Sequence, residues 1–152
     1  MRRATVLFGA ILLLLPACGA PAPSPADPWT ALAGPERPLP PDVERAEGRR
    51  GPTGGTILQP SSVPIEHGVA YRFALGHCGL ASPVDLDGSF WVAVEGVTAG
   101  SEPVDLTTDP EMINATEGVA AVIGDEMRFR TDSGTLVRFS RHLGEREFPG
   151  CD

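Results

Sequence analysis

Two short turns near the C-terminal end of the chain separate three segments that favour β-strands, and this pattern constrains the fold most. Residues 119–123 are apolar, and residues 127–131 and 136–140 alternate apolar and polar side chains. Gly124-Asp125 and Asp132-Ser133-Gly134 lie between them. Period-two alternation is typical of a strand with one buried face, and turns this short join neighbouring antiparallel strands. The sequence therefore predicts an antiparallel meander, with its arginines toward water. The side chains expected in the core are Met127, Phe129, Val137 and Phe139.

Three more strands are predicted upstream. Residues 69–75 alternate in the same way, residues 89–95 follow the hairpin dipeptide Asp87-Gly88, and residues 55–58 form a probable first strand. Only residues 109–115 favour a turn of helix. The expected fold is all-β, a small antiparallel sandwich or partly open barrel of about six strands.

The first 17 residues have the layout of an export signal. Arg2 and Arg3 give a positive start, and the apolar run 6–15 is too short to span a membrane, which takes roughly 20 residues. The run ends in Leu15-Pro16-Ala17-Cys18, which resembles the lipobox of bacterial lipoproteins, although Pro16 departs from the usual residue at its position.

This resemblance implies that residues 1–17 are removed and that Cys18 becomes the first residue, carrying a diacylglyceryl group. Two acyl chains provide stable anchoring where a single chain does not. The expected location is the cell membrane, lipid-anchored on its extracytoplasmic face. The alternative is an ordinary secretory signal, cut near Ala17 or Ala20, with Cys18 as a bystander.

Residues 18–53 are expected to form a tether between the acylated cysteine and a β domain at 54–152. Nine of the sixteen prolines lie in residues 19–53, and proline-rich segments act as extended, semi-rigid spacers. Trp29 and Leu32 are either a stray apolar pair in this tether or a contact with the domain or a partner.

Removal of the signal leaves ten basic and twenty acidic residues. So acidic a surface disfavours nucleic acid as a partner and is repelled by anionic headgroups. The partners expected instead are the membrane, through the lipid at Cys18, and an unknown envelope protein or small ligand.

If Cys18 is acylated, Cys78 and Cys151 remain as a pair in an exported chain, and we predict one disulfide between them. Two free thiols are the alternative. The pattern Tyr71-x-Phe73, His77-Cys78-Gly79 and Asp87-Gly88-x-x-Trp91 resembles a group of uncharacterised exported actinobacterial proteins, and this resemblance implies fold and export without an activity.

No catalytic, zinc-binding or nucleotide-binding motif is found in the sequence, so we expect a binding or structural module that is not an enzyme and needs no cofactor. Two alternatives stay open. One is a hydrolase that uses His67, His77 or His142; the other is a small-ligand or Ca²⁺ binder that uses Asp85 and Asp87, although the calcium-loop pattern is incomplete.

Trp91 is the second aromatic residue that we consider for contact with a partner, after Trp29. Neighbouring strand residues face opposite ways, so Phe90 and Trp91 cannot both fill one core. Trp91 is therefore expected either to contact a partner or to cover the outer face of the sheet.

Overall fold

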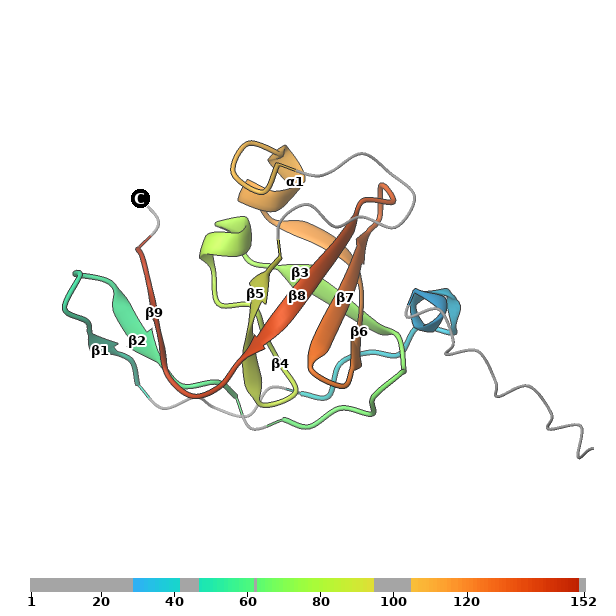
Figure 1. Cartoon of the computed structure of the whole chain (residues 1–152), viewed down its shortest axis with the longest axis horizontal. Coiled ribbons are helices and arrows are strands. Elements are labelled where there is room, and N and C mark those ends of the chain that lie inside the picture. The colour runs from blue at the N-terminus through green and yellow to red at the C-terminus, as the bar shows by residue number, and fades with distance from the viewer. Residues whose placement is uncertain (1–28, 42–46, 62, 95–104, 151–152) are drawn as a thin grey trace, which may run out of the picture.

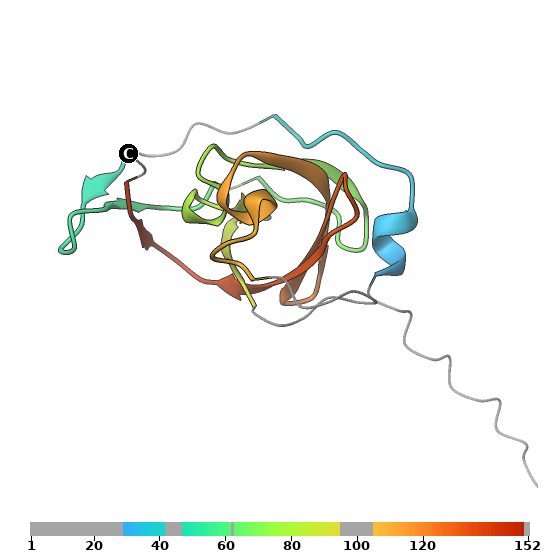
Figure 2. The ribbon, with the colours of Figure 1, turned by 90° about the horizontal axis from the view of Figure 1, so that it is seen from above.

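The computed structural model describes residues 29–41, 47–61, 63–94 and 105–150. These residues form a mostly β fold with one six-stranded and one three-stranded antiparallel sheet (Figure 1). The larger sheet curls into a half-barrel, best seen from above in Figure 2. The antiparallel, β-rich fold expected from the sequence is thus confirmed. Its elements are η1 Thr30–Ala33, β1 Arg49–Arg50, β2 Thr56–Leu58, β3 Tyr71–Leu75, η2 Gly79–Ala81, β4 Asp85–Leu86, β5 Ser89–Ala93, α1 Pro110–Ile113, β6 Thr116–Ile123, β7 Glu126–Thr131, β8 Leu136–His142 and β9 Arg146–Phe148.

The half-barrel has the strand order β3-β6-β7-β8-β5-β4. The predicted meander is present as β6, β7 and β8, with Met127 paired to Val122 on one side and to Phe139 on the other. Every strand pairs antiparallel with its neighbours in this sheet. The alternation in the sequence correctly predicted β7 and β8 and the face on which Met127, Phe129, Val137 and Phe139 are buried.

Apolar side chains from all six strands fill the concave side of the half-barrel. The predicted core residues Met127, Phe129 and Phe139 are fully buried, and Val137 is 2% exposed. Phe73 meets Phe129 edge to face, with ring centroids 5.9 Å apart. Edge-to-face contact adds to the stability that burial of the rings provides.

Arg128 corrects the expectation that the arginines of the meander face water, because it is only 7% exposed. Its guanidinium lies 5.0 Å from the centre of the Trp29 ring and pairs with the carboxylate of Glu126. A guanidinium can be covered in this way because its flat face stacks on aromatic rings. Trp29 therefore covers part of the convex face of the half-barrel.

Residues of the expected tether also pack on this convex face. Leu32, in η1, is 1% exposed and joins a second apolar cluster with Ala70, Val119 and Ala121. Further along, Arg37 donates its backbone N–H to Ala70 O and accepts one from Arg72, both at 2.9 Å. Residues 29–37 are therefore bound along the edge and outer face of the sheet.

The three-stranded sheet, of order β1-β2-β9, lies beside the half-barrel on the side opposite η1 (Figures 1 and 2). The carboxylate of Glu147 holds the β1–β2 turn, since it accepts hydrogen bonds from the backbone of Thr53 at 3.1 Å and of Gly55 at 3.0 Å. Phe148 connects the two sheets through an edge contact with Phe90 at 4.9 Å. In the part of the chain that the structure describes, no helix has the length and apolar character needed to cross a bilayer.

Candidate functional site

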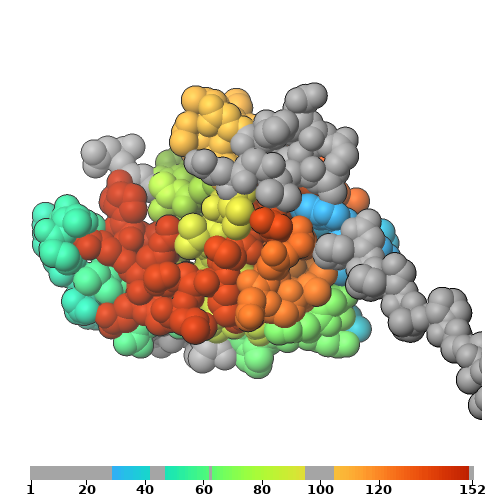
Figure 3. All heavy atoms as spheres, in the orientation of Figure 1, coloured from blue at the N-terminus to red at the C-terminus, as the bar shows by residue number. Residues whose placement is uncertain are grey.

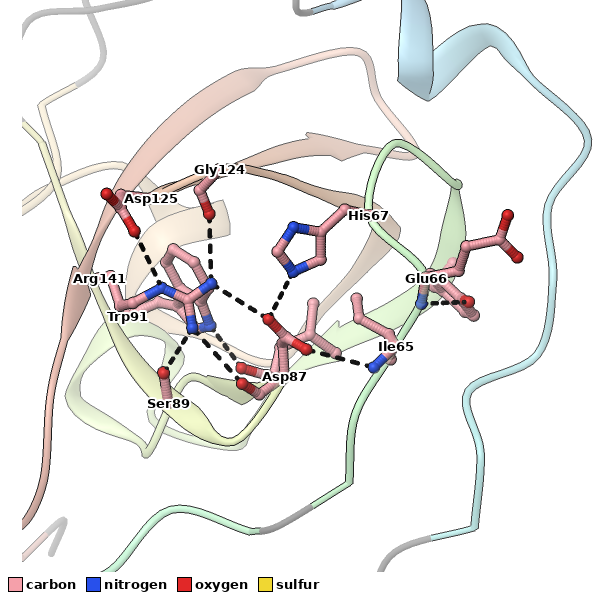
Figure 4. Close-up of polar contacts among 11 residues, drawn as sticks. Ile65, Glu66, His67, Asp87, Ser89, Trp91, Gly124, Asp125 and Arg141 are labelled. Carbon is pink, nitrogen blue, oxygen red and sulfur yellow. Dashed lines mark hydrogen bonds and ion pairs between the residues drawn. The ribbon is translucent and has the colours of Figure 1, made fainter.

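Two of the candidate residues, His67 and Asp87, meet in a cluster of charged groups at the turn between β4 and β5 (Figure 4). Asp87 and Gly88 both have positive φ angles, 56° and 64°, as the two central residues of a type I′ hairpin turn require. The predicted Asp-Gly hairpin is therefore present. It joins β4 to β5 and directs the Asp87 carboxylate toward His67 and Arg141.

Three donors contact the Asp87 carboxylate. His67 Nε2 lies 2.7 Å from it, Arg141 Nη2 lies 3.1 Å from it, and the backbone N–H of Ile65 donates at 3.3 Å. Partial burial raises the pKa of Asp87, but these hydrogen bonds outweigh burial and hold the pKa below its ordinary value. The carboxylate is thus ionised and fully engaged at neutral pH.

Arg141 connects this cluster to neighbouring strands. Its Nη1 donates to Ser89 Oγ at 2.7 Å, and its Nη2 donates to the carbonyl of Gly124 at 3.2 Å. The guanidinium carbon also lies 4.5 Å from the centre of the Trp91 ring. The cluster consequently joins the β4–β5 turn to β8 and to the β6–β7 turn.

Trp91 is 1% exposed, so the expectation of a surface tryptophan available to a partner is wrong. Its Nε1 donates to the carbonyl of Leu86 at 2.7 Å, and its ring belongs to the main core. Phe90, its neighbour, is also fully buried, because Phe148 of β9 covers the other face of β5. Apolar groups on both sides of β5 bury both residues.

Neither aspartate considered for calcium presents a free carboxylate. Asp85 accepts hydrogen bonds from the backbone N–H of Ser61 at 2.8 Å and from its hydroxyl at 3.4 Å, while Asp87 faces a guanidinium. Among the described residues, no group of three metal-ligating side chains could hold an ion. These contacts fix the loop that precedes β3 onto the β4–β5 hairpin.

The three histidines of the hydrolase alternative have different neighbours. His67 contacts Asp87, His142 Nε2 contacts the carbonyl of Glu145 at 3.0 Å, and His77 lines a cavity at the opposite end of β3. Ser89, the hydroxyl nearest to the charged cluster, is 3% exposed and its oxygen accepts from Arg141. A nucleophile needs access to substrate and a base that takes its proton, whereas Ser89 is buried and is hydrogen-bonded to a guanidinium.

A cavity of about 470 Å³ lies at one mouth of the half-barrel, between η2 and α1. These two elements are adjacent at the top of the molecule in Figure 3, where they are light green and gold. Gly79 allows this contact, because a Cβ there would lie 2.2 Å from the carbonyl of Met112. The lining residues are His77, Cys78, Leu80, Ala81, Leu106, Met112, Ile113 and Asn114. No motif in the sequence indicated this cavity, because its walls come from separate segments.

The two other cysteines of the predictions, Cys18 and Cys151, lie outside the described residues. The acylation and the disulfide therefore remain predictions. Comparison with known proteins gave no matching family model, no matching curated relative and no matching solved structure.

Proposed function

We propose that this protein is a lipoprotein that is anchored through Cys18 to the extracytoplasmic face of the cell membrane and acts as a binding or structural module rather than an enzyme. The segment Leu15-Pro16-Ala17-Cys18 supports the anchor. The lack of a catalytic motif in the sequence carries the non-enzymatic part of the proposal. The engagement of Asp87 by three donors agrees with a structural role, because it ties the loop before β3 to the β4–β5 hairpin.

The docking of residues 29–37 supports a short connection between anchor and domain. Only residues 19–28 separate Cys18 from Trp29. Ten residues span at most about 36 Å even when they are fully extended. A tether that reached to residue 53 would allow about three times that distance. The lipid thus holds the η1 side of the domain close to the membrane surface.

A disulfide between Cys78 and Cys151 is part of the proposal. Cys78 precedes η2, and β9 ends at Phe148, three residues before Cys151. An acylated Cys18 has no thiol to compete for either partner. The bond would tie the C-terminal strand to the mouth of the half-barrel, and it would stabilise the fold by about 4 kcal/mol in the chain-entropy model.

The test is the intact mass of the protein extracted from its native membrane, before and after reduction. We expect the mass of residues 18–152 plus a diacylglyceryl group, and a gain of two hydrogens on reduction. The Cys18→Ala variant is the control and should carry no lipid. An unlipidated protein in the medium would disprove the anchor, and an unchanged mass on reduction would disprove the disulfide.

A further inference from the structure

We propose that the cavity between η2 and α1 binds a small, uncharged amphipathic molecule, with an apolar chain inside and a hydrogen-bonding head at the rim. This site is separate from Asp85 and Asp87, and it does not depend on the lipid anchor. Its volume of about 470 Å³ falls within the range of roughly 300–1,000 Å³ that is usual for small-molecule sites.

The apolar side chains of Leu80, Leu106, Met112 and Ile113 line the cavity, and polar and apolar atoms contribute equally to its exposed wall. Met112 is fully buried beneath it and is part of the main core, against which Leu80 and Leu106 also pack. Ile113, which lines the cavity, is 46% exposed. An exposed apolar surface that lines a concave site favours an apolar ligand, because binding removes that surface from water.

The described acidic residues near the cavity are engaged in hydrogen bonds of their own. The side chain of Asp109 accepts the backbone N–H of Glu111 at 2.8 Å and begins α1. The carboxylate of Glu111 accepts from Thr131 at 3.2 Å. Asp105 accepts the backbone N–H of Thr107 at 2.9 Å and its hydroxyl at 2.7 Å, which lowers the pKa of Asp105. None of these carboxylates lines the cavity.

The polar groups of the rim are suited to a neutral head. Asn114 donates its side-chain amide to the carbonyl of Pro110 at 3.0 Å, which fixes its orientation beside α1. The imidazole of His77 lies on the same rim. Among the lining residues that the structure describes there is no Asp, Glu, Lys or Arg, although the chain has a net charge of −8. An alcohol or amide head can hydrogen-bond there without desolvating a charge, which would be costly.

The chain offers a sensitive readout, because it has only three methionines. We would label their methyl groups with ¹³C in the full-length chain, assign Met112 with Met112→Leu, and titrate with hexan-1-ol. The Met112 resonance should shift with saturation. Met127, which is fully buried in β7 and does not line the cavity, serves as the internal reference and should not shift.

Matched variants separate this site from general partitioning. Ile113→Asp should weaken hexan-1-ol binding at least tenfold, because a carboxylate would enter the apolar wall. Leu143→Asp alters the other large exposed apolar residue of the described chain, 78% exposed, and should have no effect. His77→Ala should weaken binding severalfold.

A charged analogue tests the ligand class. Hexanoate at pH 8 should bind at least tenfold more weakly than hexan-1-ol, and equal binding would overturn the assignment to an uncharged ligand. The site itself would be refuted by an unsaturable shift of both methionines, by no shift of Met112, or by an unchanged response in Ile113→Asp. These results are independent of the mass measurement, so failure of the cavity and failure of the anchor are distinguishable.

Discussion

Replacement of Leu32 by Ala tests whether residues 29–37 are part of the folded domain. Leu32 is 1% exposed and packs against Ala70, Val119 and Ala121. Buried Leu→Ala changes cost about 2–5 kcal/mol, and the cost is larger where the surroundings cannot close the cavity. Val119 and Ala121 belong to β6, which is paired on both sides, so they cannot move far into the space. We therefore expect a loss of about 3 kcal/mol in the free energy of unfolding.

The assay is urea unfolding of the full-length chain followed by tryptophan fluorescence, with the midpoint and slope compared between variants. Leu143→Ala is the matched control, because Leu143 is 78% exposed and surface changes usually stay within about 0.5 kcal/mol. A residue in a tether would behave like this control. Equal midpoints for Leu32→Ala and Leu143→Ala would therefore refute the docking, and with it the short connection to Cys18.

Two further predictions concern turns. Gly79→Ala should destabilise the protein by more than Gly124→Ala in the same urea assay. Both glycines have a positive φ, 51° and 61°, but of the two only Gly79 faces a backbone carbonyl of α1. Equal losses of stability would contradict this close contact. Because the folded-state pKa of Asp87 lies below its ordinary value, its stabilising effect is complete above about pH 5 and is lost as the pH falls through that lowered pKa. Asp87→Asn should thus cost about 1–3 kcal/mol at pH 7 and flatten the acid side of the stability curve. The control is Asp125→Asn, which alters a 97% exposed carboxylate beside the same guanidinium. It should leave both the stability at pH 7 and the acid side of the stability curve unchanged, and equal pH profiles of the two variants would refute the stabilising role of Asp87.

The strands of the half-barrel could be predicted because their signals are local. Each of the segments 71–75, 127–131 and 136–140 carries its own alternation, and the turns between neighbours are short. The Asp-Gly turn before β5 was recognisable for the same reason, since two positive φ angles demand few residue types. A period-two pattern indicates which side chains share a face, and packing then buries that face.

The shorter strands and the docked segment could not be predicted in this way. β9 pairs with β2, and Phe148 lies opposite Thr56, which is far away in the sequence. Trp29 lies three residues before Leu32, but prolines interrupt any apolar periodicity around this pair, so no local pattern marks Leu32 as buried. The cover over Arg128 likewise comes from Trp29, nearly a hundred residues earlier. Such contacts depend on tertiary structure, which a local pattern does not contain.

The candidate sites show the same limit. The sequence indicated Asp85 and Asp87 as candidate ligands of a cation and His67 as a candidate catalytic residue. The structure brings Asp87 and His67 together, and Arg141 of β8 joins them. Charge alone could not reveal whether these groups bind a ligand or one another. The cavity could not be predicted because its described walls come from separate segments, around residues 77–81, 106 and 112–114, which only the fold brings together.

The arrangement of the elements also determines what the proposed anchor would present to a partner. η1 packs on the convex face of the half-barrel, and the three-stranded sheet lies on the opposite side (Figure 2). If Cys18 is acylated, the span of about 36 Å available to residues 19–28 keeps the η1 side near the bilayer. The three-stranded sheet is on the side of the domain opposite this attachment, while the cavity mouth at η2 and α1 lies between these two sides. A lipid-anchored domain with this orientation offers both the cavity and the β1 edge to molecules that approach from outside the membrane.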